Sequence, residues 1–512
     1  MNQLKKNLGN NENWDVRKVN LAFLFLLIGI FFFLGFQSEF FLGPKGIHFI
    51  RQVDSLSFVY GYSNNGYIFF QPELFDLSSK GGKAACEFPI LYYIVALSFN
   101  VFGQKIFLLK LINLLIAYTG IFYLFRLLQD ILKDKIYALL VVMLLFTSTV
   151  FNYYSFNYLP DTAALGFCFI GWYYINRFKN KNENTSIILS FLFFALSGLL
   201  KITYLIHPIA ILGLVLFTFI FKKLNSEQRK KILKTFIYSV LTVLIVFLWN
   251  WYILAYNSIN QSTLFNTKPL PIWALSSSEI DLVWSYISEF WYTVYFAPST
   301  LHLLLVLIVL QALRFSKIDN IFSTLIIFSL IGIITFSLLF YQQFKDHDYY
   351  ALIAAPLVIF LFANGIIGLR SITNNRYVHI VIKLIFSIIA IVGINYSRMK
   401  LDQRFHVKPD NVSRAALIIQ KNLTEIIKLN IPLSSKVIIG PEESLNGSLL
   451  FLNRKGWSIF YKNQIDSIKL NQYKGYGAGY LFLMTEDEEK QKLANSIGAE
   501  ILRRKNLHVY KF

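Results

Sequence analysis

The sequence runs TFIYSVLTVLIVFLWNWYILAY over residues 235–256, which is 22 residues without an Asp, Glu, Lys or Arg. A helix of about 20 apolar residues is long enough to cross the hydrocarbon core of a bilayer. Comparable runs recur from Val19 to about Asn395. The strands of a membrane barrel would instead be about ten residues long with alternating polarity. The pattern therefore predicts an α-helical polytopic membrane protein.

The composition agrees with this fold class. Of the 512 residues, 55% are hydrophobic and 15% are charged, whereas charged residues make up about 25% of soluble domains. The formal net charge of +20 comes largely from Lys and Arg in short loops, where they set membrane orientation. We therefore expect membrane lipids as partners and no nucleic acid. Cys86 and Cys168 are too few for a disulfide framework and are expected to be free.

We predict about eleven transmembrane helices plus juxtamembrane helices. The predicted spans are 19–36, 105–127, 136–152, 161–176, 186–201, 203–221, 235–256, 298–314, 319–341, 349–369 and 377–396. The basic loops place the N-terminus in the cytoplasm if segment 88–103 lies along the interface instead of crossing. The basic N-terminus precedes an apolar run without a small-residue cleavage pattern, so we expect an uncleaved anchor.

The sequence divides into two predicted domains. Residues 1–399 form a transmembrane domain whose first outer loop is 37–104, and residues 400–512 form a small soluble α/β domain outside the membrane. In that domain we predict strands at 437–440, 457–460, 480–484 and 508–512, with a helix at 445–453. A further helix is expected to start at Thr485, which is followed by acidic residues.

The unusual polar residues fall on the outer side in this topology. Asp54 and Glu87 lie in the first outer loop, Asp161 in the second, Lys201 at the third turn, and 342–350 in the fifth. A charged side chain at a membrane boundary is costly unless it is solvated, paired or functional. We therefore expect a reaction site at the lipid–water boundary.

Each acidic candidate also has a structural alternative. Asp54 follows Arg51 by three residues, so the two could form a surface ion pair; alternatively, Asp54 is a general base. Glu87 and Asp161 could simply be acids at helix starts, where the helix dipole favours them. Their role is open on sequence alone.

The basic candidates are equally open. Lys201 could be a snorkelling lysine or a phosphate contact. His347 stands between Asp346 and Asp348 and could be a metal ligand, although adjacent side chains rarely point at one ion. The sequence has no HExxH, CxxC, P-loop or GxSxG motif, which disfavours zinc proteases, nucleotide-driven pumps and α/β-hydrolases.

Taken together, these motifs resemble a known family. The first outer loop reads Arg51-Gln52-Val53-Asp54, then Asn65-Gly66, Gln71-Pro72, Glu87-Phe88-Pro89-Ile90-Leu91-Tyr92-Tyr93 and Phe102-Gly103. Later landmarks are Pro160-Asp161, Gly198-Leu199-Leu200-Lys201, His347-Asp348-Tyr349-Tyr350 and Asn453-Arg454-Lys455-Gly456-Trp457. The set resembles the GT-C glycosyltransferases, in the branch with protein O-mannosyltransferase-like and aminoarabinose-transferase-like enzymes.

The resemblance implies a GT-C fold and transfer from a polyprenyl-phosphate sugar at the outer face of a bacterial inner membrane. It implies that Asp54, Glu87 and Asp161 are catalytic. One departure matters, because aminoarabinose transferases have Glu-Lys-Pro where this chain has Glu87-Phe88-Pro89. The missing lysine contacts lipid phosphate in that family. Lys201 is the first candidate to replace it, followed by Arg51, Lys345 and His347.

The remaining expectations concern the substrates and a cofactor. Tyr92, Asp348, Tyr349 and Tyr350 are expected to contact substrate. No cofactor is certain; a divalent cation, Mg²⁺ or Mn²⁺, is an open alternative, with Asp54, Glu87 and Asp161 as its ligands.

The predicted function is inverting transfer of a sugar to a hydroxyl or amine on a glycan, lipid or protein. The alternatives are a polytopic transporter or flippase and a polymerase or ligase of lipid-linked glycans. A transporter would be expected to have internal repeats and ionisable residues at the bilayer midplane, and the sequence has no clear repeat.

Overall fold

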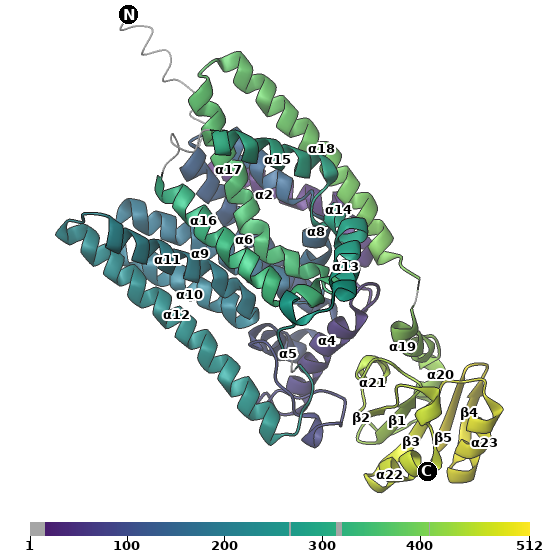
Figure 1. The fold of residues 1–512 in the computed structure, drawn as a ribbon. Helices are drawn as coiled ribbons and strands as arrows, with labels where there is room; N and C mark the ends of the chain where they lie inside the picture. Colours follow the sequence, from purple (N-terminus) through teal and green to yellow (C-terminus); the bar gives the residue numbers. More distant parts are fainter. Residues whose placement is uncertain (1–15, 266–267, 314–319, 409) are drawn as a thin grey trace, which may run out of the picture.

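The computed structural model describes residues 16–265, 268–313, 320–408 and 410–512. A bundle of long helices is followed by a small α/β domain at the end of the chain (Figure 1). The bundle contains α2 (Val16–Phe33), α6 (Phe107–Leu132), α7 (Lys135–Leu145), α8 (Thr149–Ser155), α9 (Asp161–Lys181), α10 (Asn184–Leu200), α11 (Ile206–Phe221), α12 (Ser226–Ile259), α13 (Ser277–Tyr286), α14 (Tyr292–Tyr295), α15 (Pro298–Leu313), α16 (Asn320–Leu339), α17 (Ala355–Ile372) and α18 (Arg376–Phe405). The chain is therefore a mostly helical, multi-pass membrane protein with a C-terminal α/β domain.

The number of spans is not confirmed. Among the described residues, six helices are long and apolar enough to cross a membrane, or up to eight if each of two bent helix pairs is one span. Four of the basic residues on which the predicted orientation depends lie outside the described residues, namely Lys5, Lys6, Arg314 and Lys317.

One predicted span is wrong as a continuous helix. The span 136–152 bends by 80° between α7 and α8, because the Ser148 side chain accepts a hydrogen bond from the Phe151 N–H and starts a new helix. The predicted span at 298–314 is present as α15, which is one arm of a helix pair that bends by 92°. Pro298 has no N–H to continue the preceding helix and instead opens α15.

Small residues let two bundle helices approach closely. A Cβ added to Gly120 on α6 would lie 2.3 Å from the Gly166 Cα on α9. Such close approach through small residues is typical of helix packing in membranes. This crossing fixes the position of the α9 N-terminus, where Asp161 lies.

The first outer loop carries three helices, namely α3 (Phe36–Glu39), α4 (Phe49–Asn64) and α5 (Ile90–Phe102). The α5 helix has 13 residues, which is fewer than the roughly 20 needed to cross a bilayer. It packs beside α4 (Figure 1). Its length agrees with the predicted interfacial helix at 88–103.

The C-terminal domain has a five-stranded sheet in the order β2-β1-β3-β5-β4. The strands are β1 (Lys436–Gly440), β2 (Gly456–Ser458), β3 (Ala478–Leu483), β4 (Ala499–Arg504) and β5 (Leu507–Lys511). The first three pair in parallel, and β5 pairs antiparallel with β3 and β4. Its helices are α19 (Asn411–Lys421), α20 (Leu423–Lys428), α21 (Gly447–Leu452), α22 (Ser467–Gly475) and α23 (Glu488–Ile497).

Four predicted strands and the helix at 445–453 are present in this domain, with three differences. The α18 helix continues to Phe405, so the predicted boundary at residue 400 falls inside it. The α23 helix is capped by the Asp487 carboxylate, which accepts from the Glu489 and Lys490 N–H groups, and not by Thr485. Strand β4 was not predicted, because its Glu500, Arg503 and Arg504 interrupt the apolar alternation.

The first outer loop and the C-terminal domain are joined directly. Asp76 forms a parallel bridge with Gly456 at the start of β2, and Leu77 N–H donates to the Gly456 carbonyl at 2.8 Å. Lys455 forms an ion pair with Glu73 at 3.1 Å. On the other side of this contact, α19 and α21 pack against α4.

Candidate active site

Five parts of the chain bring the candidate residues together. The α4 helix supplies Arg51 and Asp54, and the loop before α5 supplies Glu87. Asp161 is the first residue of α9, while Lys201 caps the C-terminus of α10 at the break before η2 (Ile202–Leu205). A short turn, η7 (Asp348–Ala354), supplies Tyr349 and Tyr350. The predicted break at Lys201 is confirmed.

The first ion pair joins Arg51 and Glu87. Arg51 Nη2 lies 3.0 and 3.2 Å from the two carboxylate oxygens of Glu87, and the Tyr92 hydroxyl also donates to Glu87. Burial acts to raise the pKa of Glu87, but Arg51 and Lys201 outweigh it and hold the pKa at about 2. Glu87 is therefore a permanent anion and a weak base.

The second ion pair joins Lys201 and Asp161. Lys201 Nζ lies 3.0 Å from Asp161 Oδ1, with side chains 18% and 3% exposed. The ammonium also lies 4.7 Å from the ring centre of Tyr349 and 5.5 Å from that of Tyr350, within cation–π range. Asp161 Oδ2 is buried without a hydrogen-bond partner in the described part of the chain. We refer to Arg51, Glu87, Asp161, Lys201 and Tyr349 as the ion-pair cluster.

Asp54 lies one turn after Arg51 on α4 but is not its ion-pair partner, so the surface ion-pair alternative is wrong. Its Oδ1 instead accepts a 2.8 Å hydrogen bond from Asn446 Nδ2 of the C-terminal domain. Burial raises the pKa of Asp54 to about 6, against the opposing effects of Arg51 and Asn446. Asp54 is therefore ionised at neutral pH and more basic than an ordinary carboxylate.

Asp348 has a different setting from the one predicted. It is fully buried, with Arg404 Nη2 at 2.6 Å and His48 Nε2 at 3.2 Å, and it accepts a hydrogen bond from Tyr154 at 2.7 Å. These contacts tie η7 to the last turn of α18 and to the start of α4. The carboxylate is engaged by protein groups and is not exposed to a substrate in this geometry, so the predicted substrate contact stays a prediction.

His347 and Tyr92 are also engaged within the protein. The His347 ring lies 5.6 Å from that of His48 and 5.2 Å from that of Tyr349. Burial, with the nearby His48 and Lys201, lowers the pKa of His347 to about 3. His347 is therefore neutral, so it is not a cation for phosphate. The Tyr92 hydroxyl is 3.2 Å from that of Ser55 and orients Glu87.

Lys345 is not part of the ion-pair cluster. Its Nζ lies 3.6 Å from Asp346 Oδ2, and both side chains are substantially exposed. Its position two residues before His347 suggested that it would lie in the site. In the structure, Lys345 is the last residue of the short turn η6 (Tyr341–Lys345). Lys345 is therefore the weakest of the four phosphate-binding candidates.

The three acids do not form a metal site. Among the described residues, no three His, Cys, Asp or Glu side chains are grouped so that they could hold a metal ion. Asp54, Glu87 and Asp161 each have a different protein partner, namely Asn446, Arg51 and Lys201. The residues present therefore do not fit the divalent cation that the sequence left open.

Several residues of the site were not predicted. His48 and Arg404 hold Asp348, Asn446 holds Asp54, and the Phe265 ring lies 5.3 Å from the Arg51 guanidinium. Asn446 is 392 positions from Asp54, so no local pattern could have joined them. Arg404 carried only a weak signal in the sequence, as a basic residue at the end of a long, largely apolar run. Its burial is seen only in the structure.

Comparisons with known proteins show what this chain is similar to. Residues 85–253 match the family model of dolichyl-phosphate-mannose-protein mannosyltransferases, a stretch that includes Glu87, Asp161 and Lys201. A comparison with curated protein sequences finds no match.

Two sets of solved structures share the fold. ArnT from Cupriavidus metallidurans, solved in the apo state and bound to undecaprenyl phosphate, has a TM-score of 0.63 at 10% identity and covers 96% of this chain and 98% of its own. The archaeal oligosaccharyltransferase AglB from Archaeoglobus fulgidus, in complex with an inhibitory peptide and a dolichol-phosphate, has a TM-score of 0.55 at 11% identity, covering 92% and 70%. The chain therefore shares the fold of ArnT and AglB, and residues 85–253 are similar to the dolichyl-phosphate-mannose-protein mannosyltransferase family.

Proposed function

We propose that this chain is an inverting glycosyltransferase that moves a sugar from a polyprenyl-phosphate carrier to a hydroxyl or amine on a glycan, lipid or protein. The observations that carry the proposal are the two partly buried cations of the ion-pair cluster and, on the same helix as Arg51, the carboxylate of Asp54, which is in no ion pair among the described residues. The structures of ArnT with undecaprenyl phosphate and of AglB with a dolichol-phosphate support a lipid phosphate as the donor group.

Arg51 and Lys201 are proposed to hold the donor phosphate. Their side chains are 20% and 18% exposed, so each keeps an accessible surface while its partner carboxylate fixes its position. Guanidinium and ammonium groups form strong charge-assisted hydrogen bonds to phosphate. They would stabilise the negative charge that develops on the leaving phosphate when the sugar departs.

Asp54 is proposed to be the general base. Of the three candidate acids, Glu87 and Asp161 are held in ion pairs, whereas Asp54 has only a neutral amide as a hydrogen-bond partner. In the reaction, an acceptor oxygen or nitrogen attacks the anomeric carbon and its proton passes to Asp54. The bond between that carbon and the phosphate oxygen breaks, and the electron pair leaves with polyprenyl phosphate. One displacement inverts the anomeric configuration.

The site is proposed to face the outer side of a bacterial inner membrane, with the N-terminus in the cytoplasm and the C-terminal domain outside. Support comes from the basic loops in the sequence. The Asn446–Asp54 contact also requires the C-terminal domain and α4 to lie on one side of the membrane.

The test uses purified protein in lipid nanodiscs with a labelled polyprenyl-phosphate sugar and envelope extract as the source of acceptor. We expect free polyprenyl phosphate and labelled acceptor to appear together, with the product anomer opposite to the donor anomer by NMR. If the donor is not consumed, the proposed function fails. If the anomeric configuration is retained, single displacement fails while sugar transfer stands.

A further inference from the structure

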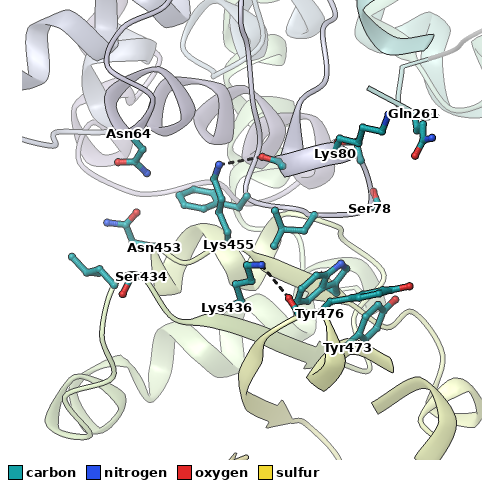
Figure 2. Close-up of a pocket in the computed structure, with 16 residues that line it drawn as sticks. Asn64, Ser78, Lys80, Gln261, Ser434, Lys436, Asn453, Lys455, Tyr473 and Tyr476 are labelled. Atoms are coloured by element: carbon teal, nitrogen blue, oxygen red, sulfur yellow. Dashed lines mark hydrogen bonds between the residues drawn. The ribbon is translucent and has the colours of Figure 1, made fainter. Parts of the chain in front are cut away.

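A large cavity lies between the first outer loop and the C-terminal domain (Figure 2). Its volume is about 1100 Å³, above the range of about 300–1,000 Å³ typical of small-molecule sites. One wall comes from residues around Lys80, and the other from β1, β2 and the end of α22. A cavity of this size has room for a ligand of several sugar units.

The floor of the cavity is aromatic. The rings of Trp457 and Tyr473 stack with centres 5.1 Å apart and planes at 14°, and Tyr476 lies 6.1 Å from Trp457. Tyr476 is 55% exposed, so its ring is available for contact. Aromatic faces of this kind combine an apolar surface with a polar edge, which suits the C–H faces and hydroxyls of a sugar.

The charge of the cavity is positive. Lys80, Lys436 and Lys455 line it, and no Asp or Glu does so among the described residues. Lys455 is paired with Glu73. Lys436 Nζ and Lys80 Nζ donate to backbone carbonyls, of Tyr476 at 3.0 Å and Ile259 at 3.4 Å, and Lys436 Nζ also lies 5.8 Å from the centre of the Trp457 ring. No carboxylate pairs with either ammonium in the described part of the chain. Two exposed ammonium groups are thus uncompensated at this wall, which favours an anionic ligand.

Polar side chains also belong to the lining. Asn64 and Gln261 are exposed and present their amides at the cavity (Figure 2). Ser79 lines the cavity too, but it is 5% exposed and its hydroxyl is buried. The exposed amides can both donate to and accept from the hydroxyls of a polar ligand.

The cavity wall is connected to the proposed base. Phe75 lines the cavity, and the next residue, Asp76, donates its N–H to Asn446 Oδ1 at 3.0 Å. Asn446 Nδ2 in turn donates to Asp54 at 2.8 Å. Two hydrogen bonds therefore separate the backbone of this wall from the carboxylate that would activate the acceptor.

We propose that this cavity binds the acceptor, and that the acceptor is an acidic saccharide. The aromatic floor contacts the sugar rings, the amides of Asn64 and Gln261 bind hydroxyls, and Lys80 and Lys436 bind the acidic groups. That this ligand is the acceptor rests on the proposed sugar transfer. That an acidic saccharide binds in the cavity does not depend on that proposal.

Binding is tested on the full-length protein in nanodiscs with a defined probe, a hexamer of galacturonic acid. The fully methyl-esterified hexamer controls for charge, and a polyglutamate of equal charge controls for a non-sugar anion. We expect the acidic hexamer to bind at least tenfold more tightly than either control. Equal binding of polyglutamate would mean that the cavity is only a charged surface and would overturn the proposal.

Matched variants locate the binding site. Tyr476→Ala and Lys436→Gln are expected to weaken hexamer binding at least tenfold. Tyr461→Ala and Lys505→Gln change exposed residues of the same domain outside the cavity and are expected to bind like the wild type. Equal affinity of all four variants would overturn the assignment of this cavity.

A third comparison separates this proposal from the proposed function. Asp54→Asn is expected to bind the hexamer normally while losing transfer. Normal transfer by a wild-type protein that does not bind the hexamer overturns the acidic-saccharide site alone. Hexamer binding without any donor consumption overturns the proposed function and leaves the binding site in place.

Discussion

At the scale of single residues, the three acids of the site differ in the groups that they contact. Glu87 is bound to Arg51 and Asp161 to Lys201, while Asp54 accepts from the neutral Asn446 amide. Ion pairing keeps the pKa of Glu87 near 2, and burial raises that of Asp54 to about 6. Since a base is most effective when its pKa is near the working pH, Asp54 is the acid suited to accept a proton.

This difference predicts the pH dependence of transfer. A base works only when ionised, so kcat should rise as pH increases through about 6 and level off above it. Glu87 should contribute no inflection in this range, because its pKa lies far below it. The measurement is kcat at saturating donor from pH 4.5 to 8.5. A rate that falls as pH rises from 5 to 7 would contradict Asp54 as the base.

The residue scale also marks the limit of sequence reasoning. Arg51, Glu87, Asp161, Lys201 and Tyr349 could be singled out because charged and aromatic residues are conspicuous between apolar runs. Their pairing could not be predicted, since the sequence left open an ion pair of Arg51 with Asp54 on one helix, whereas Arg51 pairs with Glu87. Pairing depends on how α4 packs against the loop before α5, which no local pattern specifies.

At the scale of elements, the contact between α4 and the C-terminal domain sets the basicity of Asp54. Removing the amide in Asn446→Ala removes a hydrogen bond that lowers the pKa of Asp54. A hydrogen bond to a charged group contributes about 1.5–3 kcal/mol, which corresponds to about one to two pH units. We expect the inflection of the pH–rate profile to move upward by about one unit or more.

Asn463→Ala is the matched control, because Asn463 is an exposed residue of the same domain. Its profile should coincide with that of the wild type. An unchanged inflection in Asn446→Ala, with normal folding, would show that the C-terminal domain does not tune the base.

The crossing of α6 and α9 is a second element with a measurable consequence. In Gly120→Ala, the added Cβ would meet the backbone of Gly166 at 2.3 Å, so the helices must separate. Overpacking of this kind costs about 1–3 kcal/mol, and we expect a lower midpoint of thermal unfolding in detergent. Gly29→Ala on α2 has nothing within 4 Å and should unfold like the wild type. Equal midpoints would contradict the close crossing.

The elements show which sequence signals were reliable. Long apolar runs and the break at Lys201 predicted the helices well, because burial in lipid depends on local composition. The bend at Ser148 and the strand β4 were missed. In these places a helix cap or pairing with a distant strand overrode the local pattern.

At the scale of the whole molecule, the account requires the site and the C-terminal domain to be outside the cytoplasm. A reporter fused after Phe512 tests this. We expect alkaline phosphatase, which folds only outside the cytoplasm, to be active, and green fluorescent protein at the same position to be dark. The opposite pair of results would contradict the predicted orientation and the access of an outer-face acceptor.

The central claim is that Asp54 is the base in sugar transfer from a lipid phosphate. Its most direct test is the rate of donor consumption by purified Asp54→Asn beside the wild type and Asp346→Asn, which changes an exposed acid outside the ion-pair cluster. The asparagine can still accept from Asn446, so the variant should insert and fold normally. The account predicts at least a hundredfold loss of turnover in Asp54→Asn and none in Asp346→Asn. Near-normal turnover in Asp54→Asn would contradict it.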